Sequence, residues 1–265
     1  MPFARVNGIR VYYELHGRGE ETVVFIGGLG SQVASWAQQV PIYSRYFRVL
    51  VFDNRGAGRT DKPDEEYSLR GMADDAVRLM DELGIETAHV VGKSMGGMIA
   101  QWLAVDHPSR VRKLVLGCTA ASRDEVGNEI LRFGRQTALR QGMKAVWLGA
   151  LFWGYSRSYI ERNLGRIREA MEAVDESEES VRGYVRQNLA CERHDARALV
   201  GTIRCPTLVI YGERDLIVSP ERSRELASLI PGAAAVEFKG AGHGFWRERQ
   251  DEVDRLVVDF LLGRR

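Results

Sequence analysis

The sequence has little cysteine and no long apolar run, and each of these features excludes one class of protein. Its 265 residues contain three cysteines, Cys118, Cys191 and Cys205, and no CxxC pair. This pattern predicts that the protein resides in a reducing compartment, which we take to be the cytoplasm. It does not predict a disulfide framework or a structural zinc site. No stretch approaches the ~20 uninterrupted apolar residues of a membrane span. The N-terminus lacks the apolar segment of a secretory signal, so we do not expect export.

A strong charge of one sign is also missing. The 37 lysines and arginines nearly balance the 36 aspartates and glutamates, which leaves a formal net charge of +1. That balance provides no field to hold nucleic acid or an anionic membrane. Hydrophobic residues make up 45% of the chain and charged residues 28%, as in ordinary globular proteins. We therefore expect a small-molecule ligand rather than nucleic acid or a membrane, while the sequence gives no indication of oligomeric state.

Short apolar runs alternate with segments of helical periodicity over most of the chain. Apolar side chains repeat at helical spacing over residues 72–83, where Gly84 ends the pattern, and again over residues 252–262. The runs expected to be strands cover residues 11–15, 22–26, 48–52, 88–91, 111–116, 207–211 and 235–238. This alternation predicts an α/β fold, in which helices cover both faces of a mostly parallel sheet.

Residues 121–199 break the alternation. They contain no convincing strand, their composition is helical and charged, and aromatic residues gather at 147–155. We interpret this segment as a helical cap inserted between two strands. The remaining residues, 1–120 and 200–265, then form a single core.

Glycine follows three of the predicted strands, at the sheet edge where open parallel sheets bind their ligands. The first such turn is Gly27-Gly28-Leu29-Gly30-Ser31. With Asp53 after the next strand, it could begin a dinucleotide-binding fingerprint. Val33 stands where that fingerprint needs its third glycine, which disfavours this function. Two interpretations remain: the turn directs backbone N–H groups at a developing negative charge, or it is an ordinary tight turn.

The second turn runs from Asp53 to Pro63 and contains two arginines and two glycines. Such a loop could hold an anion. We favour a structural interpretation, in which Asp53 and Arg55 fix the loop by internal hydrogen bonds.

The third turn, Gly92-Lys93-Ser94-Met95-Gly96, resembles the end of a phosphate-binding P-loop. Thr87 stands where a P-loop requires glycine, and residues 88–91 are expected to be a strand, so we exclude that function. The pattern Gly-x-Ser-x-Gly between a strand and a helix is instead typical of a nucleophile elbow. Ser94 is therefore the candidate nucleophile, while Lys93 is interpreted as a structural or solvent-reaching charge.

A serine nucleophile needs a histidine base and an acid that orients the histidine. Of the five histidines, His243 lies in a glycine-rich segment just after the last predicted strand, where it can reach across the sheet edge. Asp215 follows the strand at 207–211 and is the preferred acid, with Glu213 as the alternative. The order Ser94, Asp215, His243 is the one expected for this type of triad.

Together these motifs resemble the α/β-hydrolase family along the whole chain. The segment from Gly92 to Ala104 and the following His107-Pro108 are similar to the 3-oxoadipate enol-lactonase branch, in which an apolar residue usually replaces Lys93. The resemblance implies an eight-stranded, mostly parallel sheet with an inserted helical cap. It also implies an oxyanion hole formed by the backbone N–H groups of Leu29 and Met95.

The predicted function is that of a serine hydrolase that cleaves a small-molecule carboxylic ester or lactone through an acyl-enzyme, with no metal or organic cofactor. The pocket should lie between the sheet edge and the cap. Its candidate lining residues, each of which could equally belong to the core, are Trp147, Phe152, Trp153, Phe245 and Trp246. Three alternatives stay open: hydrolysis of a carbon–carbon bond in a vinylogous diketone, cofactor-free perhydrolase or haloperoxidase activity, and a slow-turnover ligand receptor.

Overall fold

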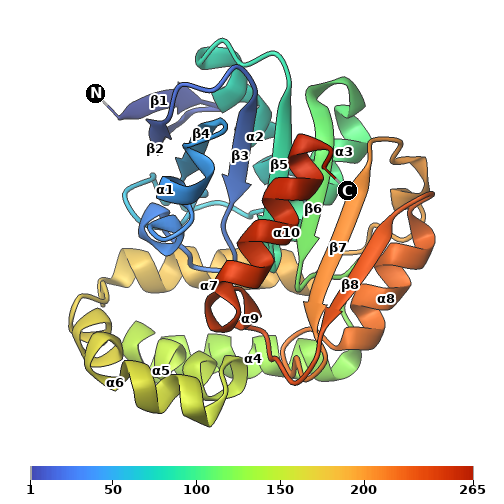
Figure 1. Cartoon of the computed structure of the whole chain (residues 1–265). Coiled ribbons are helices and arrows are strands. Elements are labelled where there is room, and N and C mark those ends of the chain that lie inside the picture. The colour runs from blue at the N-terminus through green and yellow to red at the C-terminus, as the bar shows by residue number, and fades with distance from the viewer. Residues whose placement is uncertain (1, 265) are drawn as a thin grey trace.

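The core of the protein is one eight-stranded sheet in the order β1-β2-β4-β3-β5-β6-β7-β8, seen in a computed structural model that describes residues 2–264 (Figure 1). β2 pairs antiparallel with both β1 and β4, and all other neighbouring strands are parallel. The predicted α/β class is confirmed. The strands are β1 (Phe3–Val6), β2 (Ile9–His16), β3 (Thr22–Ile26), β4 (Arg48–Phe52), β5 (Ala88–Lys93), β6 (Val111–Gly117), β7 (Thr207–Gly212) and β8 (Ala234–Phe238).

The central strands are apolar throughout because both faces of the sheet are buried. In β3, Val24 and Ile26 pack into one hydrophobic cluster, while Val23 and Phe25 pack into the other. β1 is not among the strands that the sequence predicts. In β1 only Val6 is buried, so the strand lacks the apolar run that marks the others.

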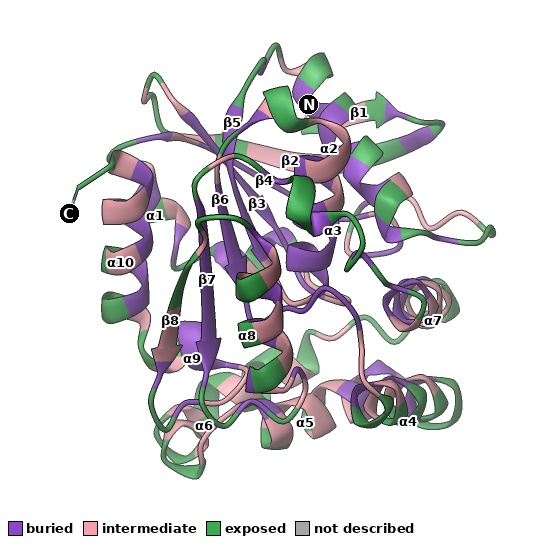
Figure 2. Ribbon diagram, turned by 90° about the vertical axis from the view of Figure 1, so that its right-hand side faces the viewer, coloured by how far each residue is buried: buried purple, intermediate pink, exposed green. Residues whose placement is uncertain are grey.

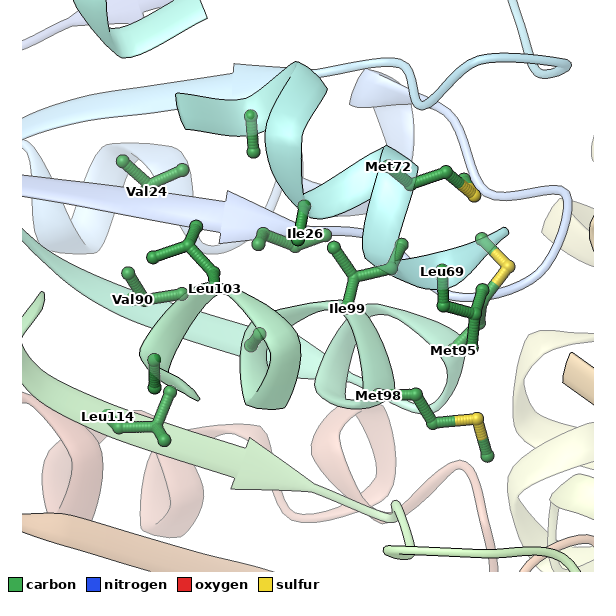
Figure 3. Packing of buried hydrophobic residues seen from close by; sticks show 14 of the residues in the cluster. Val24, Ile26, Leu69, Met72, Val90, Met95, Met98, Ile99, Leu103 and Leu114 are labelled. Atoms are coloured by element: carbon green, nitrogen blue, oxygen red, sulfur yellow. The ribbon is translucent and has the colours of Figure 1, made fainter. Parts of the chain in front are cut away.

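Helices cover both faces, as expected (Figure 2). α2 (Leu69–Glu82), α3 (Met95–Asp106) and α8 (Pro220–Leu229) lie on one face, and α1 (Val40–Tyr43), α9 (Phe245–Glu248) and α10 (Gln250–Leu262) lie on the other. Figure 3 shows how α3 is seated: Ile99 and Leu103 pack over Ile26 and Val90 of the central strands. The 3-10 turns are η1 (Val33–Trp36), η2 (Pro108–Arg110) and η3 (Val200–Thr202).

Four further helices lie between β6 and β7 and extend across the carboxyl ends of the strands (Figure 1). We call them the cap helices: α4 (Glu125–Gln141), α5 (Met143–Gly154), α6 (Arg157–Glu172) and α7 (Glu178–Glu192). The predicted helical character of this segment is confirmed, while its boundaries at 121 and 199 stay a prediction. Its two ends meet in an isolated β-bridge between Ser122 and Asp195.

The cap helices differ in how closely they contact the core. α7 lies against the second glycine-rich turn, where a Cβ on Gly183 would overlap the carbonyl oxygen of Gly56. Arg186 of α7 also pairs with Asp64. By contrast, α6 buries none of its side chains. None of the helices in residues 2–264 has the length and apolar composition needed to cross a bilayer.

Candidate active site

Ser94 occupies the sharp turn between β5 and α3, as the nucleophile-elbow pattern predicts. Its backbone has φ +55° and ψ −122°, a conformation that L-residues rarely adopt. Such a conformation costs about 1–3 kcal/mol and persists only where the surroundings enforce it. Here the Ser94 N–H donates to the carbonyl of Gly117 at 2.8 Å, which fixes the turn against β6.

Steric crowding explains why both flanking positions of the motif are glycine. A Cβ on Gly92 would overlap the carbonyl oxygen of Gly96, and a Cβ on Gly96 would overlap that of Ile26. Both positions therefore need a residue without a side chain, because the strand and the helix approach each other at backbone distance.

His243 and Asp215 form a hydrogen-bonded pair at the same sheet edge. His243 Nδ1 lies 2.7 Å from Asp215 Oδ2. The other carboxylate oxygen of Asp215 accepts from the backbone N–H groups of Ile217, at 2.9 Å, and Val218, at 3.0 Å. The alternative acid, Glu213, instead accepts from the Gly240 N–H, away from the imidazole.

The surroundings of His243 favour its protonated form. Burial alone lowers the pKa of this imidazole, but the adjacent Asp215 carboxylate and the Cys118 side chain outweigh burial and raise the pKa above its ordinary value. Because Nδ1 faces Asp215, Nε2 is the nitrogen left to exchange a proton with another group.

Cys118 completes a cluster beside this pair. Its Sγ, a carboxylate oxygen of Asp215 and a ring nitrogen of His243 all lie within 4.8 Å of one another. These are donor types that a transition metal accepts. The direct contact between Asp215 and His243 also suits the pair to moving a proton.

The turn after β3 presents its backbone to Ser94. The Ser31 N–H donates to the carbonyl of Gly28 at 3.0 Å, and Gly30 adopts φ +67°. Since N–H and C=O of a trans peptide point in opposite directions, the Leu29 N–H points away from this internal bond. A Cβ on Gly28 would lie 3.3 Å from Ser94 Cβ, so the turn and the serine are close neighbours.

Met95 is the second residue whose backbone N–H is expected to be an oxyanion donor. It is the first residue of α3, where a backbone N–H has no acceptor within its own helix. The helix dipole adds partial positive charge at the same end. Leu29 and Met95 thus both lie beside Ser94, in turns whose N–H groups suit an anionic oxygen.

Ser94 and His243 line one cavity of about 620 Å³ between the sheet edge and the cap helices. Leu29, Met95, Trp147, Trp153 and Trp246 line it as well.

Two predicted lining residues are wrong. Phe152 is 61% exposed on the outer side of α5, and it does not line the cavity. Phe245 is fully buried in the core, where its ring stacks on that of Phe238 at 5.1 Å.

The comparisons with known proteins identify the family of this chain. A family model described as the alpha/beta hydrolase fold matches residues 21–246. The chain belongs to the α/β-hydrolase family.

Individual relatives of this α/β-hydrolase carry different names. It is 32% identical to "Putative carbamate hydrolase RutD" of Caulobacter sp. (strain K31), in an alignment that covers 99% of both chains. The enol-lactonase from Burkholderia xenovorans LB400 superposes with a TM-score of 0.91 at 33% identity, covering 98% of this chain and 100% of that one. The meta-cleavage product hydrolase from Pseudomonas fluorescens IP01 gives a TM-score of 0.79 at 28% identity, covering 97% and 95%.

The structure of this α/β-hydrolase also explains residues other than Ser94, Asp215 and His243. Asp53 fixes its loop, accepting from the N–H groups of Val33 at 2.6 Å and Arg59 at 2.8 Å. Arg55 instead reaches out of the loop to Asp75 on α2. The structural interpretation of that loop is therefore confirmed for Asp53, whereas the internal hydrogen bonds expected of Arg55 are wrong, because its guanidinium pairs with acids outside the loop. The other histidines contact Glu14 (His16), Glu21 (His89), Asp74 (His107) and Trp102 (His194).

Sequence reasoning missed three residues around the cavity. Lys93, interpreted from the sequence as a structural or solvent-reaching charge, lines the cavity next to Ser94, and Arg123 lines it from the segment after β6. Gln187 of α7 bonds to the Gly30 N–H. Arg123 stands shortly after a strand end, which could have indicated it, whereas no local pattern indicates Gln187.

Proposed function

We propose that this α/β-hydrolase is a serine hydrolase that cleaves a small carboxylic ester or lactone through an acyl-enzyme on Ser94. The observation that carries the proposal is the 2.7 Å contact between Asp215 and His243 on the wall of the cavity that Ser94 also lines. A serine hydroxyl is a weak nucleophile until a base takes its proton, and the oriented imidazole is that base.

The reaction follows from these positions. Ser94 Oγ attacks the carbonyl carbon while His243 Nε2 takes the hydroxyl proton, and Asp215 stabilises the imidazolium. The Leu29 and Met95 N–H groups bind the oxyanion of the tetrahedral intermediate, and each such donor is typically worth about 3–4 kcal/mol. The bond to the leaving oxygen then breaks as His243 returns the proton to it. Water repeats the cycle on the acyl-enzyme, releasing the acid and restoring Ser94.

Hydrolysis of a carbamate is the second candidate. A carbamate carbonyl can undergo the same attack by Ser94, and the relative named as a carbamate hydrolase aligns over 99% of both chains. The likeness to a meta-cleavage product hydrolase also keeps carbon–carbon bond hydrolysis within the range of activities to be tested.

A substrate panel on wild type and Ser94→Ala tests the proposal. The panel contains aryl esters, lactones, an aryl carbamate and a ring-cleavage dienone. We expect esters or lactones to be turned over best, and Ser94→Ala to lose at least about 1,000-fold in kcat. Ser35→Ala is the matched control, because Ser35 lines the same cavity outside the elbow. Full activity in Ser94→Ala would overturn the mechanism.

Two further measurements separate the remaining alternatives. Turnover that requires hydrogen peroxide and a carboxylic acid indicates a perhydrolase. A ligand that raises Tm while hydrolysis stays far below typical enzyme rates indicates a receptor. A fluorophosphonate should label wild type and leave Ser94→Ala unlabelled.

A further inference from the structure

His243 lies in a segment of the chain that has little stiffness of its own. Three of the surrounding residues are glycines, Gly240, Gly242 and Gly244. Glycine restricts the backbone less than any other residue does. Before the histidine, the core holds this segment, because the Arg214 N–H donates to the carbonyl of Ala241 at 2.8 Å. The orientation of the imidazole therefore also depends on what holds the backbone after it.

The backbone that follows His243 is held by the cap. The Gly244 N–H donates to the carbonyl of Gly154 at 2.6 Å. Gly154 is the last residue of α5, where a carbonyl has no donor within its own helix. A Cβ on Gly154 would lie 3.8 Å from the Cβ of His243, so the end of this cap helix is a close neighbour of the histidine. The next N–H, of Phe245, donates to Gly242 within the same turn and gives no hold outside it.

The aromatic ring of Tyr155 packs on the same glycine. A Cβ on Gly244 would lie 2.3 Å from a ring carbon of Tyr155, so the ring leaves no room for a side chain there. The Tyr155 ring also stacks on that of Tyr159 in α6, with ring centroids 4.7 Å apart and planes inclined by 16°. The hydrogen bond from Gly154 and the packed ring together fix the peptide that joins His243 to Gly244.

Glu248 of α9 ties this junction between α5 and α6 to the core. Its two carboxylate oxygens accept from the backbone N–H of Ser156 at 2.8 Å and from the Ser156 hydroxyl at 2.6 Å. α9 is itself anchored, since Trp246 Nε1 donates to the buried carboxylate of Asp254 at 2.8 Å. Glu248 does not line the cavity, so it has no direct contact with a substrate bound there.

We propose that Tyr155 and Glu248 position the base of the reaction, because together they hold the cap against the backbone of His243. This inference rests on the proposed function and makes the cap part of what sets the rate of the chemical step. Asp215 fixes the imidazole at Nδ1, and the cap junction fixes the backbone from which the imidazole projects. The direction of Nε2 towards the nucleophile then depends on both.

Glu248→Ala tests this role without changing the cavity wall. On the best ester, kcat should fall about 10- to 100-fold while KM stays within about threefold, because the base is displaced and the binding surface is kept. Glu248→Gln should recover part of the loss, since its amide oxygen can still accept from the Ser156 N–H. A kcat for Glu248→Ala within about twofold of wild type would overturn the role.

Arg186→Gln is the matched control. Arg186 pairs with Asp64 and so joins α7 to the core, as Glu248 joins the start of α6. Neither Arg186 nor Asp64 lines the cavity or bonds to residues 240–244. We expect kcat to equal that of wild type. A fall as large as that of Glu248→Ala would mean that any weaker attachment of the cap slows the reaction, and would overturn a specific role for Glu248.

Tyr155 is tested by a pair of substitutions. Tyr155→Ala removes the ring from Gly244 and should lower kcat about 10- to 100-fold. Tyr155→Phe keeps the ring and should restore kcat to within about threefold of wild type. A fall in Tyr155→Phe as large as that in Tyr155→Ala would mean that the hydroxyl matters rather than the packing, and would overturn the role of the ring. Thermal melting checks folding, and if Tyr155→Ala does not fold, Glu248→Ala decides the proposal.

A spectroscopic measurement keeps the positioning role separate from the chemistry. The proton between His243 Nδ1 and Asp215 is observed by NMR in Ser94→Ala, in which no acyl-enzyme forms. Adding Glu248→Ala should weaken this resonance through faster exchange with water, because the imidazole is held less firmly, and adding Arg186→Gln should not. An unchanged resonance with Glu248→Ala would overturn the role even where kcat falls, and would leave the hydrolase proposal standing. Full activity of Ser94→Ala would instead overturn the hydrolase proposal and leave this readout intact.

Discussion

The side-chain oxygen of Gln187, on α7, accepts a hydrogen bond from the backbone N–H of Gly30 at 2.8 Å. The amide nitrogen of the same side chain donates to the carbonyl of Arg55 at 2.7 Å. Gln187 is fully buried, so one side chain joins a cap helix to two glycine-rich turns of the core. Because Gly30 follows Leu29, this contact orients the peptide next to the proposed oxyanion donor.

Gln187→Met should therefore impair the chemical step more than substrate binding. The substitution removes both hydrogen bonds and keeps an unbranched side chain of similar length. We expect kcat to fall about 10-fold with KM nearly unchanged, since the oxyanion forms only after substrate has bound. Steady-state kinetics on the best ester measure this split, and a boronic acid that mimics the tetrahedral adduct should bind more weakly.

Asn188→Leu is the control for Gln187→Met. Asn188 is the next residue of α7 and equally buried, but it bonds to the Leu131 carbonyl and to Arg135 rather than to the oxyanion turn. It should lose stability without a selective fall in kcat. An equal fall in kcat for both variants would mean that any disturbance of α7 has this effect, which contradicts a positioning role for Gln187.

The Asp215–His243 pair predicts a particular pH dependence. The base must be neutral to accept a proton, so kcat/KM should rise with pH through the pKa of His243. Asp215 raises that pKa. Asp215→Asn should therefore move the acid limb of the profile to lower pH. It should also cut kcat by about 1,000- to 10,000-fold, because the imidazole loses its orientation and the imidazolium loses its stabilising charge.

Glu213→Gln separates this effect from the loss of any nearby acid. Glu213 lies two residues before Asp215 and bonds to the Gly240 N–H, not to the histidine. Its profile should match that of wild type. A pH profile for Asp215→Asn that stays where wild type has it would argue against Asp215 as the partner of His243.

His194 should make the protein sensitive to mild acid. Its Nδ1 accepts from Trp102 Nε1 at 3.2 Å, and its Nε2 lies 3.2 Å from the Ala120 carbonyl, so the buried ring is neutral. Burial lowers its pKa from 6.5 to about 4. As the pH falls, His194 therefore takes up its proton in the unfolded chain before it does so in the folded protein. The free energy of unfolding that His194 contributes above pH 6.5 is consequently lost as the pH falls towards 4. The loss from this group approaches about 3 kcal/mol.

Urea unfolding at pH 7 and pH 4.5 measures the loss. His194→Gln cannot take up the proton, so its free energy of unfolding should change less between the two pH values than that of wild type. His107→Gln, on the surface at the end of α3, should keep the wild-type dependence. Equal dependence in wild type and His194→Gln would rule out His194 as the source.

The close approach of α7 to the core predicts opposite effects for two glycine substitutions. In Gly183→Ala the new methyl group overlaps the Gly56 carbonyl, and α7 must move away, at a cost of about 1–3 kcal/mol. In Gly165→Ala, on exposed α6, the methyl group meets nothing within 4 Å. The second change should stabilise the helix by about 0.5–1 kcal/mol. Thermal and urea unfolding of both variants test the pair, and destabilisation by both would contradict it.

Ser94, Asp215 and His243 could be named as candidates because each lies within five residues of the end of a strand of the parallel sheet. Carboxyl ends of such strands meet at one edge, so local sequence is enough to bring the residues together. β1 could not be predicted, since its residues lie at the margin of the sheet and do not form an apolar run.

The cavity wall was harder to predict for a physical reason. α5 is apolar on nearly all sides, so its periodicity does not tell which of two adjacent residues, Phe152 and Trp153, faces inward. Gln187 bonds to backbone atoms of two turns, and Arg123 lines the cavity. Gln187 lies 157 residues from Gly30 in the sequence. A single sequence carries no signal for such distant partners.

The two sides of the cap differ in how many contacts attach them to the core. α7 is attached to the core at Gly56 and through Gln187, whereas α6 buries no side chain and lies at the outer end of the layer (Figure 1). Near its start, Ser156 bonds to Glu248 of α9. The cap is therefore attached to the core unevenly, and the Ser156–Glu248 hydrogen bond is one of the contacts near α6. We expect α6 to open locally at a lower free-energy cost than α7, because it has no buried side chain to expose.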